Sequence, residues 1–386
     1  LDGRINRATP DAPLNIQPII DALSPKDKTK PPTQFDLKIN TVVIRRSDVA
    51  YDILSAPRPA QGRFDPNHIA VSNLRADITL PRIANDNFSI DIIELATTER
   101  SGFTLKDLSG KLHITDKGIT FTNPEIDFGQ SKVRLSDLAV SYSSFETMAQ
   151  DIKRQTHSLQ LKEGTVIVPA DLSPFIPQIA DLDFPVEILA SAKGNLEDID
   201  IDILQVSAPR QNISLDLKGS VSGLSTKTPD ILLQRLDLKC NGAMLADLLS
   251  RFATPAPRIK DILTKAADIS LEGSGRYFSP TASFAGTLTS GLGNIDLDAK
   301  ADLTAPIAIA GSVRTTDFAL GQVIDNQKFG LVTADVEVDI KLASPIPMGH
   351  FAGKIDRFDF NGYGFSAIAA DLSYDGTTIE GTVKSD

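Results

Sequence analysis

The segment LVTADVEVDIKL, residues 331–342, alternates apolar and polar side chains with a period of two. Val332, Val336 and Ile340 belong to its apolar positions, and Asp335 and Glu337 lie between them. Successive side chains of a β-strand point to opposite faces, so this pattern predicts a strand with one apolar and one solvated face. A chain built largely of such strands must hold a large apolar sheet surface.

The same alternation recurs along much of the chain, for example at 199–203, 213–217 and 295–303. Turn residues interrupt it at intervals of about ten residues between 68 and 142, a spacing typical of an antiparallel meander. Glycines are scattered through the strand regions, where they mark bends and bulges. We therefore expect a mainly β protein, an elongated antiparallel sheet that curls into a groove and carries a few short helices.

The chain divides, on composition and periodicity, into an N-terminal segment and linker (1–34), a β-meander groove unit (35–160) and a repeat region (161–386). The linker prediction rests on the Pro- and Lys-rich stretch SPKDKTKPPTQ at 24–34. Helical periodicity appears in patches whose starts lie about 73 residues apart, which predicts a degenerate repeat of one small helix followed by long strands. These patches are 171–180, 244–252 and 318–324, with a further one at 259–269.

Composition excludes several classes of function. The chain has 39 Lys and Arg against 50 Asp and Glu, a net charge of −11, so binding to nucleic acid is disfavoured. The single cysteine, Cys240, excludes an internal disulfide framework, and no apolar run is long enough for a membrane span. The chain begins without Met and ends within a strand pattern, so we expect a fragment of a longer protein.

The chemistry of an enzyme is also absent from the sequence. The four histidines are widely separated, without a second His or Cys at metal-ligand spacing. The GSVSG stretch at 219–223 has Val221 where a nucleophile elbow needs serine. The row Asp198, Asp200 and Asp202 has the spacing of a solvated strand face, although three carboxylates on one face also suit Ca²⁺. We expect no catalytic residues, no cofactor and no metal.

The apolar rows are the remaining candidate site. The hydrophobic effect has no direction, so linings of Val, Ile and Leu can hold a lipid chain without fixing its position along a groove. The predicted groove-lining residues are Ile199, Ile201, Ile203, Ile213, Leu215, Leu217, Ile295, Leu297, Val332, Val336, Val338 and Ile340.

Three stretches carry a resemblance to a known family: DFALGQVI at 317–324, FGLVTADV at 329–336 and IDRFDFNGY at 355–363. In this order they resemble the repeats of the AsmA/TamB family, especially TamB-like proteins of Bacteroidetes, and FDLKI at 35–39 and SGFTL at 101–105 are similar to that group as well. The resemblance implies a protein anchored in the inner membrane by an N-terminal helix, with a long β-groove (a β-taco) in the periplasm. It further implies phospholipid transport for outer-membrane biogenesis, contact with an outer-membrane barrel protein, and no catalytic residues.

Two other functions fit the same pattern. A closed β-array, packed on itself, would bind no ligand and would need larger side chains in facing positions. An assembly or translocation module for outer-membrane barrel proteins would act through its strand edges rather than through its apolar face.

Overall fold

The computed structural model describes residues 2–19, 36–58, 60–84, 87–144, 155–342 and 348–385. The predicted linker at 24–34 lies outside the described residues. The chain forms two compact units, unit 1 (residues 1–195) and unit 2 (residues 196–386). The sequence-based division at residue 160 instead falls inside a strand of unit 1.

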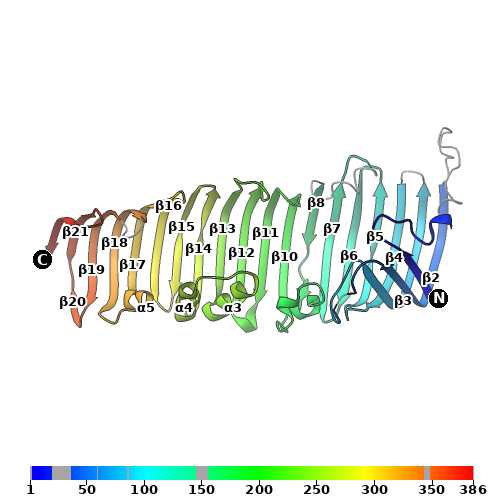
Figure 1. Cartoon of the computed structure of the whole chain (residues 1–386), viewed down its shortest axis with the longest axis horizontal. Coiled ribbons are helices and arrows are strands. Elements are labelled where there is room, and N and C mark those ends of the chain that lie inside the picture. The colour runs from blue at the N-terminus through cyan, green and yellow to red at the C-terminus, as the bar shows by residue number, and fades with distance from the viewer. Residues whose placement is uncertain are drawn as a thin grey trace. The chain divides into compact units, whose positions relative to one another are not determined.

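Unit 1 is an antiparallel meander with one parallel strand at its edge (Figure 1). The edge strand β1 runs parallel to β2, and β2 to β7 then pair in sequence order. β7 pairs with β8 and β9, and both of these pair with β10. The strands are β1 (Asp2–Arg7), β2 (Asp36–Ile53), β3 (His68–Ala84), β4 (Asn87–Glu99), β5 (Thr104–Thr115), β6 (Gly118–Phe128), β7 (Ser131–Ser141), β8 (Thr156–Leu161), β9 (Val166–Ile167) and β10 (Val186–Gly194).

The sheet of unit 1 is strongly curled, because segments far apart in its strand order touch. The backbone N–H of Phe64, in the β2–β3 connection, donates to the carbonyl of Pro174, which lies between β9 and β10, at 3.0 Å. The Phe64 ring lies 5.0 Å from the Phe175 ring, which in turn lies 5.1 Å from that of Phe103. Aromatic packing thus fills one end of the curl.

The sequence-based prediction of one helix at 171–180 is wrong. The structure has two short 3₁₀ helices there, η2 (Pro169–Leu172) and η3 (Pro177–Ile179). Pro174 and Pro177 lack the backbone N–H that a continuous α-helix needs. The first helical turn therefore ends at Leu172, and a second one begins at Pro177. Phe175, which lies within the predicted helix, joins the aromatic cluster with Phe64 and Phe103.

Unit 2 is a continuous antiparallel meander in which each strand from β11 to β19 pairs with the next (Figure 1). β19 pairs with both β20 and β21, and β21 with β22. The strands are β11 (Ile199–Ala208), β12 (Ile213–Ser222), β13 (Asp230–Asn241), β14 (Asp268–Phe278), β15 (Thr281–Ser290), β16 (Gly293–Asp302), β17 (Ile307–Ala319), β18 (Phe329–Leu342), β19 (Met348–Phe360), β20 (Tyr363–Phe365), β21 (Ile368–Tyr374) and β22 (Ile379–Ser385).

Three α-helices lie at one end of these strands: α3 (Gly242–Phe252), α4 (Pro257–Lys265) and α5 (Leu320–Ile324). A 3₁₀ turn, η4 (Pro209–Gln211), joins β11 to β12. The expectation of a mainly β, antiparallel fold with a few short helices is therefore confirmed. Four strands lie between η3 and α3 and four between α4 and α5, so the order of elements repeats along the chain.

Candidate functional site

One face of the unit 2 sheet is apolar from strand to strand. Residues that pair across antiparallel strands point to the same face, so the pairing register shows which side chains lie side by side. One row runs through Leu217, Leu236, Gly273, Gly286, Leu297, Val313, Val336, Gly353 and Ala370. The next runs through Leu215, Leu238, Leu271, Leu288, Ile295, Thr315, Ala334, Ile355 and Ile368. We call the surface made by these and the parallel rows the apolar face.

The opposite face is polar and exposed. On β16, Asp296, Asp298 and Lys300 are exposed, whereas the alternate Ile295 and Leu297 are half-buried. Across β17 and β18, Arg314 donates to Asp335 at 2.7 Å. Such exposed pairs contribute little stability, so their main effect is to keep this face in water.

Among the described residues, helices cover the apolar face at one end of its strands. There, Leu245 of α3 and Ile262 and Leu263 of α4 pack against a buried cluster that includes Cys240 and Leu292. Burial raises the pKa of the Cys240 thiol, which favours a packing role over a reactive one.

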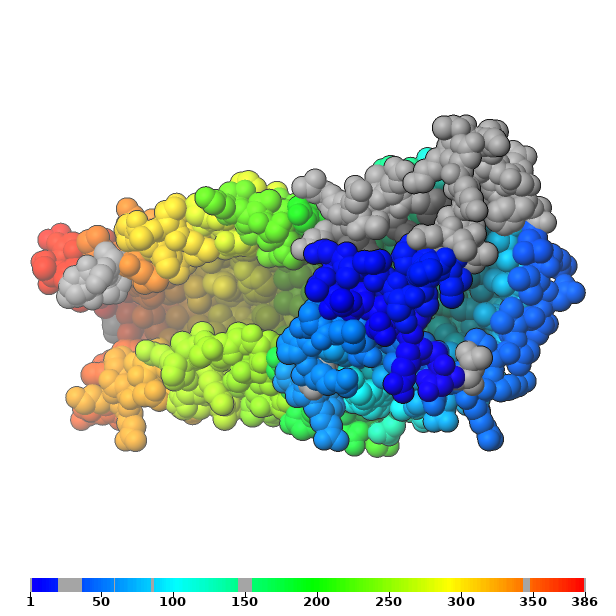
Figure 2. Space-filling model, turned by 45° about the vertical axis from the view of Figure 1, so that its right-hand side comes forward, coloured from blue at the N-terminus to red at the C-terminus, as the bar shows by residue number. Residues whose placement is uncertain are grey.

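Away from the helices the apolar face remains accessible. Ile295 and Leu297 of β16 and Val338 and Ile340 of β18 are only half-buried, whereas Val336 on the same face is buried. Figure 2 shows the surface of unit 2 hollowed between two rows of atoms, coloured from green to orange. The site is therefore an open trough with an aliphatic lining.

Eleven of the twelve residues predicted to line the groove lie on the apolar face. On β11, Ile199 and Ile201 pair with Val221 and Gly219 of β12 and share their side. Ile203 does not, because the register shifts between Ile201 and Leu204. This bulge puts Leu204 on the apolar face and turns Ile203 to the other side, where it is 38% exposed.

The sequence reasoning also missed residues that belong to the apolar face. On two strands the apolar period is hidden in the sequence. β13 has a bulge, at which its register shifts between Leu233 and Leu236, and β19 has Gly349 and Gly353 at two of its apolar-face positions. The strict alternation of β14 and β15 was a usable signal. The missed residues are Leu204, Leu236, Leu238, Leu271, Phe284, Leu288, Ile309, Val313, Phe351 and Ile355.

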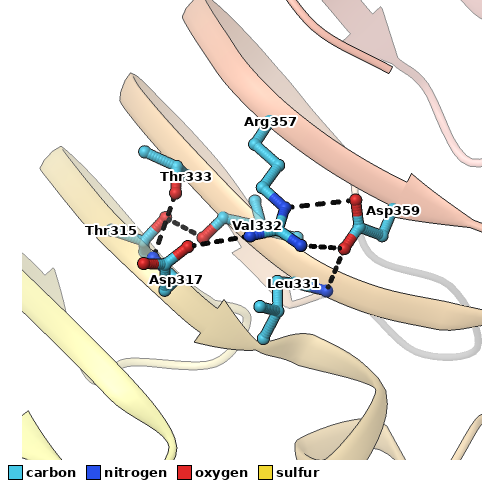
Figure 3. A network of polar contacts seen from close by, with 7 residues as sticks. All are labelled: Thr315, Asp317, Leu331, Val332, Thr333, Arg357 and Asp359. Atoms are coloured by element: carbon cyan, nitrogen blue, oxygen red, sulfur yellow. Dashed lines mark hydrogen bonds and ion pairs between the residues drawn. The ribbon is translucent and has the colours of Figure 1, made fainter. Parts of the chain in front are cut away.

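A polar network holds the bulges of β17 and β19 on the exposed face of the sheet, opposite the apolar face, at the strand ends near α5 (Figure 3). Arg357 pairs with Asp317 at 3.1 Å and with Asp359 at 2.8 Å. Asp317 adopts a left-handed conformation (φ 47°), and its N–H donates to the Thr333 hydroxyl at 3.0 Å. The Arg357 guanidinium, through its hydrogen bonds, lowers the pKa of Asp359, which is therefore ionised at neutral pH. It ties three strands together where their ladders are interrupted.

The groups considered for metal or acid–base chemistry are dispersed. Within the described ranges, no set of three His, Cys, Asp or Glu side chains is placed to hold a metal ion. His68 instead bonds to Asp52 at 2.8 Å, and His350 to Asp371 at 2.9 Å. In the same ranges no helix combines the length and hydropathy that crossing a bilayer requires.

Neither a protein-family model, nor a curated protein, nor a solved structure matches this chain. The resemblance to the AsmA/TamB family therefore stays a prediction from the five sequence stretches quoted above.

Proposed function

We propose that the apolar face of unit 2 binds the acyl chains of phospholipids and conducts them along the trough. The observation that carries this proposal is that a largely aliphatic surface runs over successive strands and that, among the described residues, helices cover it at one end of the strands. Soluble proteins rarely leave so large an apolar surface open unless something binds there. A closed, self-packed array would bury the rows along their whole length, whereas Ile295, Leu297 and Val338 are half-buried and burial is reached at Ala334, Val336 and Ala370.

The energetics suit transport rather than tight, fixed binding. Each acyl methylene that leaves water contributes about 0.8 kcal/mol, so a lipid must keep apolar contact along its whole path. From β12 to β19 the apolar face crosses seven strand spacings, about 34 Å at about 4.8 Å each. Because aliphatic contacts are non-directional, a chain can slide along such a surface over small barriers. The charged headgroup would remain in water at the open side.

The cellular setting of this proposal follows from the sequence resemblance. We propose that the full-length protein lies in the periplasm, is anchored in the inner membrane by a helix N-terminal to this chain, and moves phospholipid between the inner and outer membranes. An outer-membrane barrel protein is the expected partner at the far side. In this role the chain acts without catalysis.

The absence of tryptophan from the chain allows a sharp test. Tyr277 and Phe278 are neighbours on β14, but Tyr277 pairs with Ile231 and Ala282 on the apolar face, whereas Phe278 points the other way and is 49% exposed. Each is replaced by Trp in a separate variant, and each variant is titrated with a phospholipid carrying brominated acyl chains. We expect quenching and a blue shift for Tyr277→Trp and neither for Phe278→Trp.

A second pair of variants tests whether occupancy depends on the apolar character of the face. Leu297→Asp places a charge on the apolar face, and Asn294→Asp places the same charge on the exposed face of the same strand. We expect Leu297→Asp to abolish phospholipid co-purification, measured by native mass spectrometry, and Asn294→Asp to leave it unchanged. Equal quenching of both tryptophans, or lipid retained by a folded Leu297→Asp protein, would contradict the proposal.

A further inference from the structure

A pocket of about 380 Å³ opens on unit 1 where strands β2 to β5 lie side by side. Its lining includes three cations, Arg46 of β2, Arg75 of β3 and Lys106 of β5, and none of the described residues that line it is acidic. We call it the basic pocket. This charge sets it apart in a chain of net charge −11. A neighbouring pocket that contains Arg58 and Arg100, for example, is also lined by three aspartates.

The pairing register brings most of the lining to one side of the sheet. Thr98 pairs with Thr104, and Arg75 pairs with Ala96. Ala96 precedes Thr98 by two residues and Lys106 follows Thr104 by two, so these positions share a face. Ala96 is buried and carries only a methyl group, which leaves space between the longer side chains around it.

Arg46 belongs to the basic pocket through a β-bulge. The register of β2 against β3 shifts between Ile44 and Ser47. Arg45 and Arg46 therefore lie opposite one residue, Arg75. Arg46 has a left-handed backbone (φ 46°), whereas the other described residues with positive φ are Gly, Asn, Asp or Ala. A long cationic side chain at such a strained position indicates that the side chain, rather than the bulge, is what the position requires.

The cations of the basic pocket are largely free to bind an anion. Arg46 and Lys106 take part in no hydrogen bond or ion pair with the described residues. Nη2 of Arg75 lies 3.9 Å from Oε1 of Glu94, which is too far for a hydrogen bond. Glu94 pairs with Asp77 beside the pocket, so these two carboxylates offset part of the charge of Arg75. An entering anion would still gain contacts without breaking a hydrogen bond of these cations.

We propose that the basic pocket binds a phosphate monoester, with its phosphoryl group on Arg46, Arg75 and Lys106. Such a group carries nearly two negative charges at neutral pH and has three terminal oxygens that point in different directions. The three cations come from three strands, which suits this tetrahedral arrangement better than the two coplanar oxygens and single charge of a carboxylate. The inference does not rest on the acyl-chain proposal, because the basic pocket belongs to unit 1.

The first test is calorimetric titration of the whole chain with glycerol 3-phosphate. We expect binding that weakens as the salt concentration rises. Arg46→Gly is the sharpest variant, because glycine adopts a left-handed backbone without strain and the fold should be at least as stable. Losing the charged hydrogen bonds of this side chain should raise the dissociation constant about tenfold. We expect a similar loss in Lys106→Gln.

Lys111→Gln is the matched control for Lys106→Gln. Lys111 is an exposed lysine of the same strand that does not line the basic pocket, so its loss removes the same charge elsewhere. We expect it to leave the affinity unchanged. Glu94→Gln removes the carboxylate beside Arg75 and should tighten binding about threefold. Equal losses in Lys111→Gln and Lys106→Gln would overturn the proposal, because they would show attraction to the whole surface rather than to this pocket.

Vesicle flotation separates the two sources of a phosphate monoester, a lipid headgroup and a soluble ester. Phosphatidylcholine vesicles are prepared with and without phosphatidic acid, whose headgroup is a phosphate monoester. Wild-type protein that floats with phosphatidic acid, together with Arg46→Gly protein that does not, would assign the pocket to a lipid headgroup. Binding of glycerol 3-phosphate without such a difference in flotation would assign it to a soluble ester. A wild type that binds neither probe would overturn the proposal.

Discussion

Gly273 and Gly286 face each other across β14 and β15, and the backbone there approaches too closely for a side chain. A Cβ at position 286 would lie 2.2 Å from the carbonyl oxygen of Glu272 and 2.9 Å from the Phe284 ring. The Phe284 ring thus occupies the space that the two glycines leave empty. At this point the apolar face carries no side chain from positions 273 and 286, and the Phe284 ring forms its surface.

We predict that Gly286→Ala destabilises unit 2 by about 1 to 3 kcal/mol, because the added methyl group must displace backbone or the ring. Urea denaturation followed by circular dichroism measures the change. Gly364→Ala is the matched control, since a Cβ there meets only Asp359 Oδ1 at 3.5 Å, an ordinary contact. We expect it to stay within about 0.5 kcal/mol of wild type. Equal losses in the two variants would contradict the close-approach argument.

His68, the first residue of β3, is a titratable side chain that bonds to β2 and to the connection between the two strands. His68 is only 3% exposed; its Nδ1 lies 2.8 Å from Asp52 and its Nε2 lies 3.1 Å from the carbonyl oxygen of Ala56. Both partners are acceptors, so both ring nitrogens donate only when the imidazole is protonated. The hydrogen bond to Asp52 raises the pKa of His68 above 6.5, against the opposing effect of burial.

The sign of the pH dependence follows from this raised pKa. The folded state binds the proton more tightly than the unfolded state, so the His68 contribution is fully present below pH 6.5 and is lost as the pH rises through the raised pKa. We predict that unit 1 is more resistant to urea at pH 6 than at pH 8.5. In His68→Gln, which cannot titrate, the difference between these pH values should shrink. Tryptophan placed at Phe64 reports the unfolding of this connection, and an unchanged pH dependence in His68→Gln would contradict the assignment.

The sequence predicts an element correctly where its apolar residues keep one spacing, two for a strand or 3.6 for a helix, from end to end. β12, β16 and residues 332–342 of β18 alternate without interruption, and Leu215, Leu297 and Val336 lie on the apolar face as the pattern predicts. The patch at 244–252 carries a helical period and forms α3, whose N-terminal N–H groups Asn241 caps. These elements could be assigned from local chemistry alone.

Elements with an interrupted period could not be assigned in this way. A bulge inserts one residue and inverts every later side chain, and the position of a bulge is set by pairing with the neighbouring strand. Ile203 on β11 was therefore assigned to the wrong side, and Leu236 on β13 was missed. The basic pocket was equally hidden, because only the pairing register defines the bulge that places Arg46 opposite Arg75.

Each unit is built by adding strands side by side, so each strand has most of its contacts with its two neighbours. In such an array stability approximates a sum of local and nearest-neighbour contributions. A change at one strand should then weaken that strand and its neighbours and fade with distance along the sheet. This behaviour differs from that of a compact domain, in which a core change lowers the stability of the whole.

Gly286→Ala also tests this difference. We predict that hydrogen exchange, followed by mass spectrometry, rises most in peptides from β14 to β16, less in β12 and β18, and stays at wild-type rates in β21. Peptides from β2 and β3 in unit 1 provide an internal reference that should not change, and Gly364→Ala should leave β14 to β16 unaltered. A uniform rise across all peptides would mean that the strands unfold as one cooperative block. A graded response would mean that the apolar face can yield at one strand while the strands farther along hold their positions, which the proposed sliding of an acyl chain along the face would require.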